Sequence, residues 1–392
     1  MELTLLFILL PVAAASGWWL AKRHYRTGLP AGTSRPAEFS ADYFRGLNLL
    51  LNEQPDKAID VFVKMLQVDN DTVETHLALG NLFRSRGEGD RAIRIHQNLI
   101  ARPTLSKAQR ALALFELAQD YLRAGLLGRA ESLFEELLAQ NEYRAEALAK
   151  LLDIYQQEKE WQKAIDTAQR YEHLTGQRMN LQIAHFYCEL GEQAFDRGDY
   201  KTAMRLARRA LNADRQCVRA SLLQARAEQA NGDYRAAIKS LKQVEKQDTG
   251  FLPEIVAPLL ACYQSLEKTG EAERYLEHLS TRYGGITPLL GLADLLCQRG
   301  KTREASERIV KSLSEKPSVR GLNHLIELHL LNSEGAAREN LLILKELTHR
   351  LLEEKLPYRC THCGFKVKTL QWRCPTCKEW ASIRPIQGVV GE

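Results

Sequence analysis

Proline is scarce in this sequence, and neither its charge nor its hydrophobicity is extreme. Only 12 of the 392 residues are proline, about 3% against an average of about 5%. Apolar residues make up 45% of the chain and charged residues 26%, which excludes a wholly disordered, collagen-like or polytopic membrane protein. The net charge of 54 − 49 = +5 is too mild to identify a partner. Because Leu, Ala, Glu, Arg and Gln are abundant, we expect a mostly helical protein.

Common catalytic motifs are missing too. The sequence contains no phosphate-binding GxxxxGK[ST], no HExxH and no GxSxG. His324 and His329 stand in a helical stretch, but a separation of five residues places them roughly 140° apart around a helix. They therefore do not converge on one metal ion, and we expect no enzyme.

The first organised feature is an uncharged run at the N-terminus. Residues 3–20 carry no charged side chain, and a helix of that length spans roughly 27 Å, enough to cross the hydrocarbon core of a bilayer. Ala13–Ala15 resembles a signal-peptide cleavage site, but no Lys or Arg precedes the run. Basic residues follow it instead: Lys22, Arg23, His24 and Arg26. We predict an uncleaved single-pass anchor over residues 1–21, with the body on the cytoplasmic side, and a basic juxtamembrane linker over residues 22–37.

The long middle of the chain, residues 38–354, repeats a helical pattern. Eight alanines recur at intervals of 33 to 39 residues: Ala58, Ala92, Ala130, Ala164, Ala203, Ala237, Ala272 and Ala305. A small residue stands twelve positions before most of them, as expected for two antiparallel helices that pack closely. The pattern resembles the tetratricopeptide repeat. The predicted fold is an all-α tetratricopeptide-repeat superhelix of about eight to nine helix pairs, the last over residues 319–354.

The turns inside three units support this register. The segments 87–90, 197–200 and 231–234 each contain a glycine, which ends one helix, and an aspartate, which we expect to cap the next. Two of the alanine intervals, of 38 and 39 residues, are longer than the others. We therefore expect an extra turn in two of the connections between units.

A repeat array has a concave face lined mainly by the first helix of each unit. Counting back eleven and seven positions from the alanines places mostly polar residues on this face. The candidates for a partner-binding groove are Asn81, Ser85, Gln119, Arg123, Asp153, Gln157, Glu192, Asp196 and Arg226. They are suited to bind a protein segment through hydrogen bonds and charge. An ordinary solvated helix face would also be polar, and the sequence leaves both interpretations open.

The eight cysteines divide into two groups. Cys188, Cys217, Cys262 and Cys297 stand singly in helical sequence, and we expect them to be small buried residues of a reducing compartment. Cys360, Cys363, Cys374 and Cys377 form two CxxC pairs separated by ten residues. Each pair can direct two thiolates from one tight turn, so we predict one tetrahedral structural metal site, with zinc favoured over iron. The module of residues 355–392 resembles a rubredoxin-type or zinc-ribbon domain.

Four cysteine ligands leave no open position for a catalytic water. The site is therefore structural, unless it holds iron and transfers electrons. Residues 358–392 contain six Lys or Arg and two Glu, an excess that suits either nucleic acid or an acidic helix face. Nucleic-acid contact is the less favoured of these two interpretations.

The order of these segments resembles the lipopolysaccharide assembly protein B family of Gram-negative bacteria. The resemblance rests on the apolar run of residues 3–20, the eight alanines and the four C-terminal cysteines. It implies an adaptor in the bacterial inner membrane that faces the cytoplasm and restrains lipopolysaccharide synthesis. The implied partners are a membrane-anchored AAA+ protease, the lipid A pathway deacetylase that this protease degrades, and other lipopolysaccharide-assembly membrane proteins.

Two other functions remain open from the residues alone. One is a membrane-tethered scaffold for an RNA or translation complex, and the other is an iron-binding electron carrier. The sequence also leaves open whether the chain forms a homodimer and whether the metal module docks on the repeats.

Overall fold

The computed structural model describes residues 41–51, 54–68, 73–353, 355–389 and 391. The chain divides into two compact units, Met1–Leu126 (unit 1) and Leu127–Glu392 (unit 2). Among the described residues, no helix is both long and apolar enough to cross a bilayer. The predicted anchor and juxtamembrane linker lie outside the described residues.

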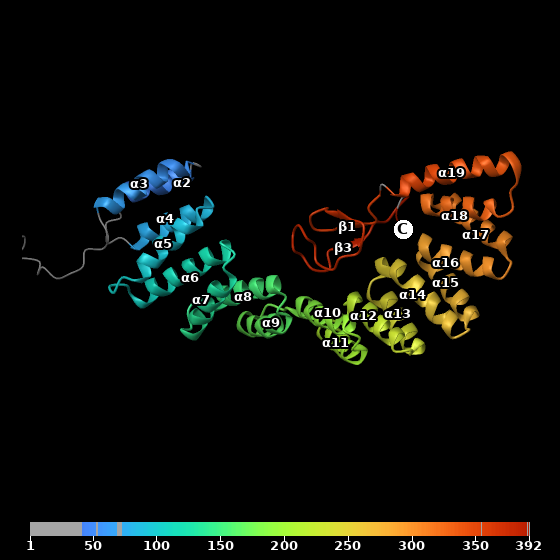
Figure 1. Cartoon of the computed structure of the whole chain (residues 1–392), viewed down its shortest axis with the longest axis horizontal. Coiled ribbons are helices and arrows are strands. Elements are labelled where there is room, and N and C mark those ends of the chain that lie inside the picture. Colours follow the sequence, from blue (N-terminus) through green and yellow to red (C-terminus); the bar gives the residue numbers. More distant parts are fainter. Residues whose placement is uncertain (1–40, 52–53, 69–72, 354, 390, 392) are drawn as a thin grey trace, which may run out of the picture. The chain divides into compact units, whose positions relative to one another are not determined.

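In the described part of the chain, helices make up the regular structure as far as residue 353. Unit 1 contains α2 (Ala41–Leu51), α3 (Pro55–Val68), α4 (Val73–Ser85), α5 (Gly89–Ile100) and α6 (Lys107–Arg123). Unit 2 contains α7 (Leu127–Ala139), α8 (Arg144–Glu158), α9 (Trp161–Thr175), α10 (Asn180–Asp196), α11 (Tyr200–Ala213), α12 (Val218–Ala230), α13 (Tyr234–Gln247), the 3₁₀ turn η1 (Thr249–Phe251), α14 (Leu252–Ser265), α15 (Thr269–Tyr283), α16 (Ile286–Gln298), α17 (Thr302–Glu315), α18 (Val319–Leu330) and α19 (Gly335–Glu353). In sequence order these 18 described helices form nine consecutive pairs (Figure 1), so the predicted repeat fold is confirmed for this part of the chain.

The alanines that define the repeat lie in the core of the array. All eight have no exposed surface, and the residues four positions after them are at most 1% exposed. The facing helix must be small at the point of contact. A Cβ added to Gly80 in α4 would lie 2.3 Å from Nε2 of His96 in α5, and a Cβ added to Gly46 in α2 would lie 2.6 Å from the ring of Phe62 in α3. Close helix packing therefore requires glycine at both positions.

Two of the three expected aspartate caps are present. Asp199 and Asp233 accept hydrogen bonds from the backbone N–H three residues later, at 3.0 and 3.1 Å. The cap expected at Asp90 is wrong, because Asp90 lies inside α5 and the N-cap of that helix is Glu88, which makes no side-chain cap. The three glycines end their helices with φ between 80° and 82°: Gly87, Gly198 and Gly232.

The long alanine intervals arise mainly within helices. The expected longer connection is present in only one of the two, where six residues (101–106) connect α5 to α6. Helix α10 has 17 residues where α12 has 13, and four residues connect α9 to α10, as they connect α11 to α12. The additional residues therefore lengthen the first helix of the unit by about one turn. Helix α6 also has 17 residues.

The chain ends in a small β module, which we call the ribbon (residues 358–389). Strand β1 (Tyr358–Cys360) pairs antiparallel with β2 (Lys366–Val367) and with β3 (Ile383–Pro385), in the order β2-β1-β3. Within unit 2 the ribbon, drawn in red, lies beside the repeat helices (Figure 1). Its end returns to the last helix pair, where the Val319 N–H donates to the Val389 carbonyl (2.8 Å).

Candidate metal centre and docking surface

The two cysteine pairs are carried by two turns of the same construction. In the first turn, the Cys360 N–H donates to the Phe365 carbonyl (2.7 Å) and the Gly364 N–H donates to the Cys360 carbonyl (3.0 Å). In the second turn the equivalent hydrogen bonds begin at Cys374 and measure 3.0 Å each. The fifth residue of each turn has a positive φ, 79° at Gly364 and 61° at Lys378. The two turns therefore direct their thiols in the same way.

The four sulfur atoms converge on one point. Cys360 Sγ lies 3.7 Å from Cys377 Sγ, and Cys363 Sγ lies 3.6 Å from Cys374 Sγ. All four lie within 4.8 Å of one another. In a tetrahedral site with metal–sulfur bonds of about 2.3 Å, the sulfurs are about 3.8 Å apart. The donor set and its spacing therefore fit one metal ion held by four thiolates.

Cys360 lies in surroundings that favour its thiolate. Desolvation opposes ionisation, but the hydrogen bond between Cys360 Sγ and Ser382 Oγ and hydrogen bonds from the N–H groups of Cys363 and His362 lower the pKa of the thiol to about 6. Ser382 Oγ lies 3.3 Å from Cys360 Sγ, and the Cys363 nitrogen lies 3.4 Å from it. In the same cluster the backbone hydrogen bond at Glu379 lowers the pKa of Cys377, but desolvation and hydrogen bonds with the other three cysteines outweigh it and raise the pKa to about 12. A metal binds deprotonated sulfurs, so its binding releases protons from the cluster.

The ribbon docks on the repeats through Trp380. This side chain is 7% exposed and stacks on His185 of α10, with ring centroids 5.0 Å apart. It meets Phe186 of α10 edge-on at 5.8 Å and Trp161 of α9 at 6.3 Å. Its Nε1–H donates to Gln156 Oε1 of α8 (3.1 Å). One tryptophan of the ribbon thus contacts three helices of two successive repeat pairs.

A second group of contacts surrounds η1. Trp372 stacks on Phe251 with ring centroids 5.5 Å apart. Arg384 forms an ion pair with Asp248 (3.0 Å), and the Tyr358 hydroxyl donates to a carboxylate of α14 (2.7 Å). Since a module of this size is too small to fold on its own apolar core, these contacts with the repeats add to its stability.

Docking removes His185 from solvent. The side chain is 3% exposed. Burial, with a smaller contribution from the charge of Arg219, lowers its pKa to about 3. The imidazole is therefore neutral at neutral pH, which suits its stacking against the indole of Trp380.

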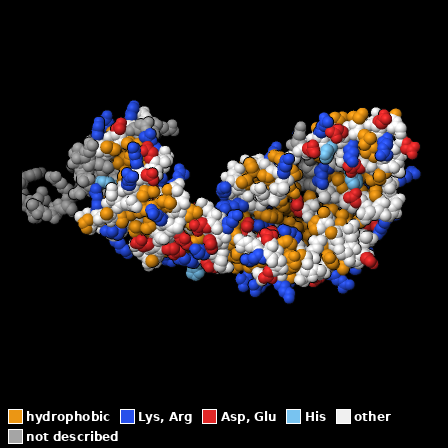
Figure 2. All heavy atoms as spheres, in the orientation of Figure 1, with side chains coloured by type: hydrophobic (Ala, Val, Ile, Leu, Met, Phe, Trp, Pro, Cys, Tyr) orange, Lys and Arg blue, Asp and Glu red, His pale blue; other side chains and the backbone are white. Residues whose placement is uncertain are grey.

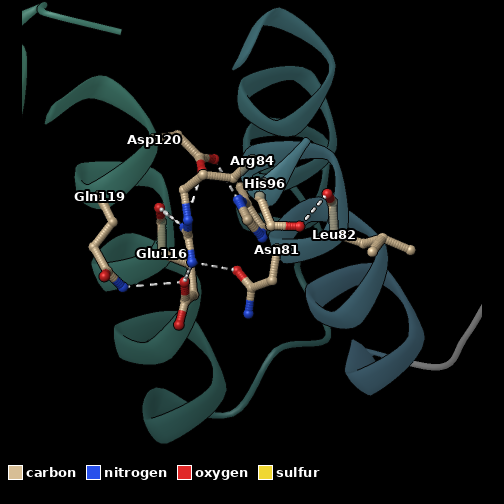
Figure 3. A network of polar contacts seen from close by, with 8 residues as sticks. Asn81, Leu82, Arg84, His96, Glu116, Gln119 and Asp120 are labelled. Atoms are coloured by element: carbon tan, nitrogen blue, oxygen red, sulfur yellow. Dashed lines mark hydrogen bonds and ion pairs between the residues drawn. The ribbon is translucent and has the colours of Figure 1, made fainter. Parts of the chain in front are cut away.

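In unit 1, two predicted groove residues belong to one polar network (Figure 3). Arg84 of α4 donates to Asn81 Oδ1 (2.7 Å) and forms ion pairs with Glu116 (2.5 Å) and Asp120 (2.9 Å) of α6. Gln119 donates to the same Glu116 (3.1 Å). The structure therefore joins Asn81 and Gln119, which lie on different helices, through an arginine and a glutamate that sequence reasoning did not select.

In unit 2, other predicted groove residues have partners of their own. Glu192 and Arg226 form an ion pair (3.0 Å). Partial desolvation raises the pKa of Asp153, while the charges of Lys150 and of Arg373 in the ribbon oppose the rise. The remaining candidates are exposed: Ser85 and Arg123 in unit 1, and Gln157 and Asp196 in unit 2.

Sequence reasoning missed the docking residues altogether. Trp372, Trp380, His185 and Phe251 do not follow from the spacing of the repeats. The available signal was the presence of two tryptophans in a module of 38 residues, since Trp is rarely left exposed without a partner. The chain has only five tryptophans, so two in the ribbon indicate a surface that packs on something else.

Comparison with known proteins agrees with both parts of this structure. Residues 358–385 match the rubredoxin metal binding domain, and three segments match tetratricopeptide repeats: 75–108, 115–178 and 194–261. The chain is 42% identical over 390 residues to lipopolysaccharide assembly protein B of Escherichia coli (strain K12), covering 99% of this chain and 100% of the relative. This chain belongs to the lipopolysaccharide assembly protein B family. The resemblance inferred from the sequence is thereby confirmed.

A second member of the lipopolysaccharide assembly protein B family is more distant. The protein of Haemophilus influenzae is 36% identical over 392 residues, covering 97% of this chain and 98% of the relative. Among solved structures, the MamA protein is similar over 47% of this chain and 96% of its own, with 22% identity and a TM-score of 0.32.

Proposed function

We propose that the chain is an inner-membrane adaptor that regulates lipopolysaccharide synthesis. It presents the lipid A pathway deacetylase to a membrane-anchored AAA+ protease, which degrades it. Membership of the lipopolysaccharide assembly protein B family supports this proposal, because the relatives match the chain over nearly its full length. The repeat fold adds a physical reason, since helical arrays bind protein segments along extended faces.

The contact surface that we propose is the first-helix face of α4 and α6 in unit 1. In unit 2 the ribbon already lies on first helices, through Gln156 of α8 and His185 of α10. In unit 1 the carboxylates of α6 hold Arg84, so that Asn81 and Gln119 are fixed before any partner binds. A preorganised polar face loses little conformational entropy on binding. We choose this surface because of this polar network.

We propose a structural role for the metal, with zinc as the ion. Four thiolates close the coordination sphere, so the metal stabilises the ribbon without exchanging a ligand. Through Trp380 the folded ribbon also contacts α8, α9 and α10. Loss of the metal is therefore expected to weaken the adaptor by loosening these repeats.

The membrane anchor of residues 1–21 is part of the same proposal. Tethering raises the effective concentration of the adaptor near a protease in the same bilayer. A reporter fused after Glu392 should have the activity expected in the cytoplasm. A chain without residues 1–21 should be released from the membrane and should no longer support degradation at normal expression. A reporter that is active only in the periplasm would contradict this topology.

The lifetime of the deacetylase in cells tests the adaptor role. Translation is blocked and the half-life of the deacetylase is followed in wild type, in a deletion strain and in a double variant, Ser85→Glu with Arg123→Glu. Both substituted residues are exposed on the proposed face, so each change should cost under about 0.5 kcal/mol of stability. The matched control is Arg303→Glu, whose side chain is 93% exposed on α17.

We expect a longer half-life and excess lipopolysaccharide in the deletion strain and in the double variant, and wild-type behaviour in the control. A half-life that is unchanged by the deletion contradicts the adaptor role. A normal half-life in the double variant alone, with the deletion defective, contradicts the choice of surface and leaves the role intact.

A further inference from the structure

Helix α19 ends the array with an exposed apolar face. Leu344 is 48% exposed, Leu347 and Leu351 are each 52% exposed, and Ile343 is 59% exposed. At 100° per residue these four residues span about 100° of the helix surface, and the buried Thr348 lies about 40° beyond Leu344. The opposite side carries polar and charged residues together with the exposed Leu342: Arg338, Glu339, Glu346, His349 and Glu353. Figure 2 shows hydrophobic side chains along the edge of unit 2 that α19 forms in Figure 1.

Earlier helix pairs cover the corresponding face. The residue seven positions after the alanine has no exposed surface in five of them: Leu99, Leu137, Ala210, Val244 and Leu279. Val244 and Leu279 belong to a core cluster that continues through successive pairs as far as α18. In α19, Ala337 lies 32 residues after Ala305 but, unlike the eight alanines of the repeat, is exposed, and Leu344 lies seven residues after it. Leu344 is half exposed because no further pair follows α19 among the described residues.

We propose that this face is a homodimer interface, in which the α19 helices of two copies pack antiparallel about a two-fold axis near Leu344. Each Leu344 then contacts its counterpart, and Leu347 of one copy packs against Ile343 of the other. Leu351 reaches the small residue Ala337 of the other copy. A two-fold interface of this kind uses the same patch on both copies, so every contact occurs twice.

The charges at the border of the face favour a second copy over an unrelated partner. Glu339 and Arg350 stand eleven residues apart along the same border of the apolar side. In an antiparallel pair, each Glu339 faces the other copy's Arg350, whereas in a parallel two-fold pair these borders of the two copies lie on opposite sides of the interface and do not meet. Arg350 also binds Glu346 of its own helix (2.8 Å). The face is therefore complementary to itself in one orientation.

The mass of the full-length protein tests this interface. The purified chain is measured in detergent by light scattering, and we expect a dimer. Leu344→Glu with Leu347→Glu should raise the Kd of the dimer by about tenfold or more. The matched control, Leu174→Glu, changes a leucine of α9 that is 37% exposed and should leave the Kd unchanged. Circular dichroism confirms that all variants are folded.

Position-specific cross-linking in native membranes distinguishes dimers that form through α19 from dimers that form through the N-terminal anchor. Leu344→Cys should form a disulfide between two copies on mild oxidation, above the background of the parent chain. His349→Cys, on the charged side of the same helix, should not. Glu339→Arg and Arg350→Glu should each weaken the dimer, and the two together should restore it, because each pair across the interface is then reversed.

The results that follow would overturn the proposed dimer interface. A monomeric wild type does so, as does a dimer whose Kd is unchanged by the Leu344→Glu and Leu347→Glu substitutions. Cross-linking of Leu344→Cys only to a different protein assigns the face to another partner. Failure of the adaptor test leaves this measurement unaffected, because the mass of the protein does not depend on deacetylase degradation.

Discussion

Trp380 of the ribbon and His185 of the repeats stack on each other, with ring centroids 5.0 Å apart and ring planes 22° apart. This contact joins two parts of the chain that are 195 residues apart in the sequence. It brings the module that carries the four-cysteine cluster into contact with the repeats within unit 2. Several consequences of that coupling are open to measurement.

Replacing Trp380 by alanine should release the ribbon from the repeats. The change removes the stacking on His185, the contacts with Phe186 and the hydrogen bond to Gln156, at a cost on the order of 3 kcal/mol or more. Limited proteolysis should cut the variant near residue 354 faster than the wild type. The control is Phe365→Ala, a ribbon side chain that is 39% exposed, which should leave the cleavage rate unchanged. Equal rates in all three proteins would show that Trp380 does not hold the ribbon.

Low pH should weaken the contact between His185 and Trp380. The pKa of His185 is about 3 in the folded protein and about 6.5 when the side chain is free in water. Between these values the unfolded state binds more protons, so His185 makes the protein less stable as the pH falls from about 6.5 towards 3. The slope is at most about 1.4 kcal/mol per pH unit.

Urea unfolding at pH 7, 6 and 5 measures this slope. His185→Phe keeps an aromatic ring against Trp380 but cannot bind a proton, so its stability should depend less on pH than that of the wild type. His349→Phe, which changes an exposed histidine of α19, should retain the wild-type dependence. Identical pH dependence in the wild type and the His185 variant would refute the role of this side chain.

The ribbon should contain one metal ion per chain, which we expect to be zinc. Cys363→Ser with Cys374→Ser removes one ligand from each turn, and elemental analysis should find the metal lost. Because metal binding and folding are coupled in small domains, the ribbon should then become sensitive to protease. Cys297→Ser, which changes a cysteine outside the cluster, is the control and should keep its metal. Full metal content in the double variant would refute the ligand assignment, and a red protein that bleaches on reduction would identify iron.

Gly80 should tolerate no side chain. An alanine Cβ would lie 2.3 Å from His96 Nε2, and the imidazole has little room to move because its Nδ1 bonds the buried Asp120 (2.5 Å). We expect Gly80→Ala to cost about 1–3 kcal/mol of stability. Gly128→Ala is the matched change, since a Cβ there meets nothing within 4 Å. It should be neutral or should stabilise α7 by up to about 1 kcal/mol. Thermal unfolding compares the two, and equal effects would exclude the steric explanation.

The repeat could be predicted because it follows from local chemistry. Alanines that recur at intervals of 33 to 39 residues indicate close helix packing, and all eight of them are fully buried. The four-cysteine site was predictable for a similar reason, since both turns are built from a few adjacent residues. The Asp90 cap was wrong because the N-cap of α5 is Glu88, two positions earlier. Local rules predict the kind of turn more reliably than the residue that caps it.

The docking of the ribbon could not be predicted, because it depends on how distant segments meet. Nothing local to His185 or Gln156 indicates that Trp380 will lie against them. Periodicity, by which the groove candidates were chosen, also gave no information about which residues contact them. Asp153 lies where it is affected by the charge of Arg373, and Glu192 pairs with Arg226. Periodicity identifies a face of a helix, whereas tertiary packing decides what covers that face.

Degradation in a reconstituted membrane tests the adaptor role most directly. The AAA+ protease and the full-length chain are placed in the same vesicles, the deacetylase and ATP are added, and the loss of intact deacetylase is followed over time. We predict that degradation is faster with the wild-type chain than without it, and that the Ser85→Glu and Arg123→Glu double variant gives little acceleration. A degradation rate that is the same with and without the chain would contradict the adaptor role.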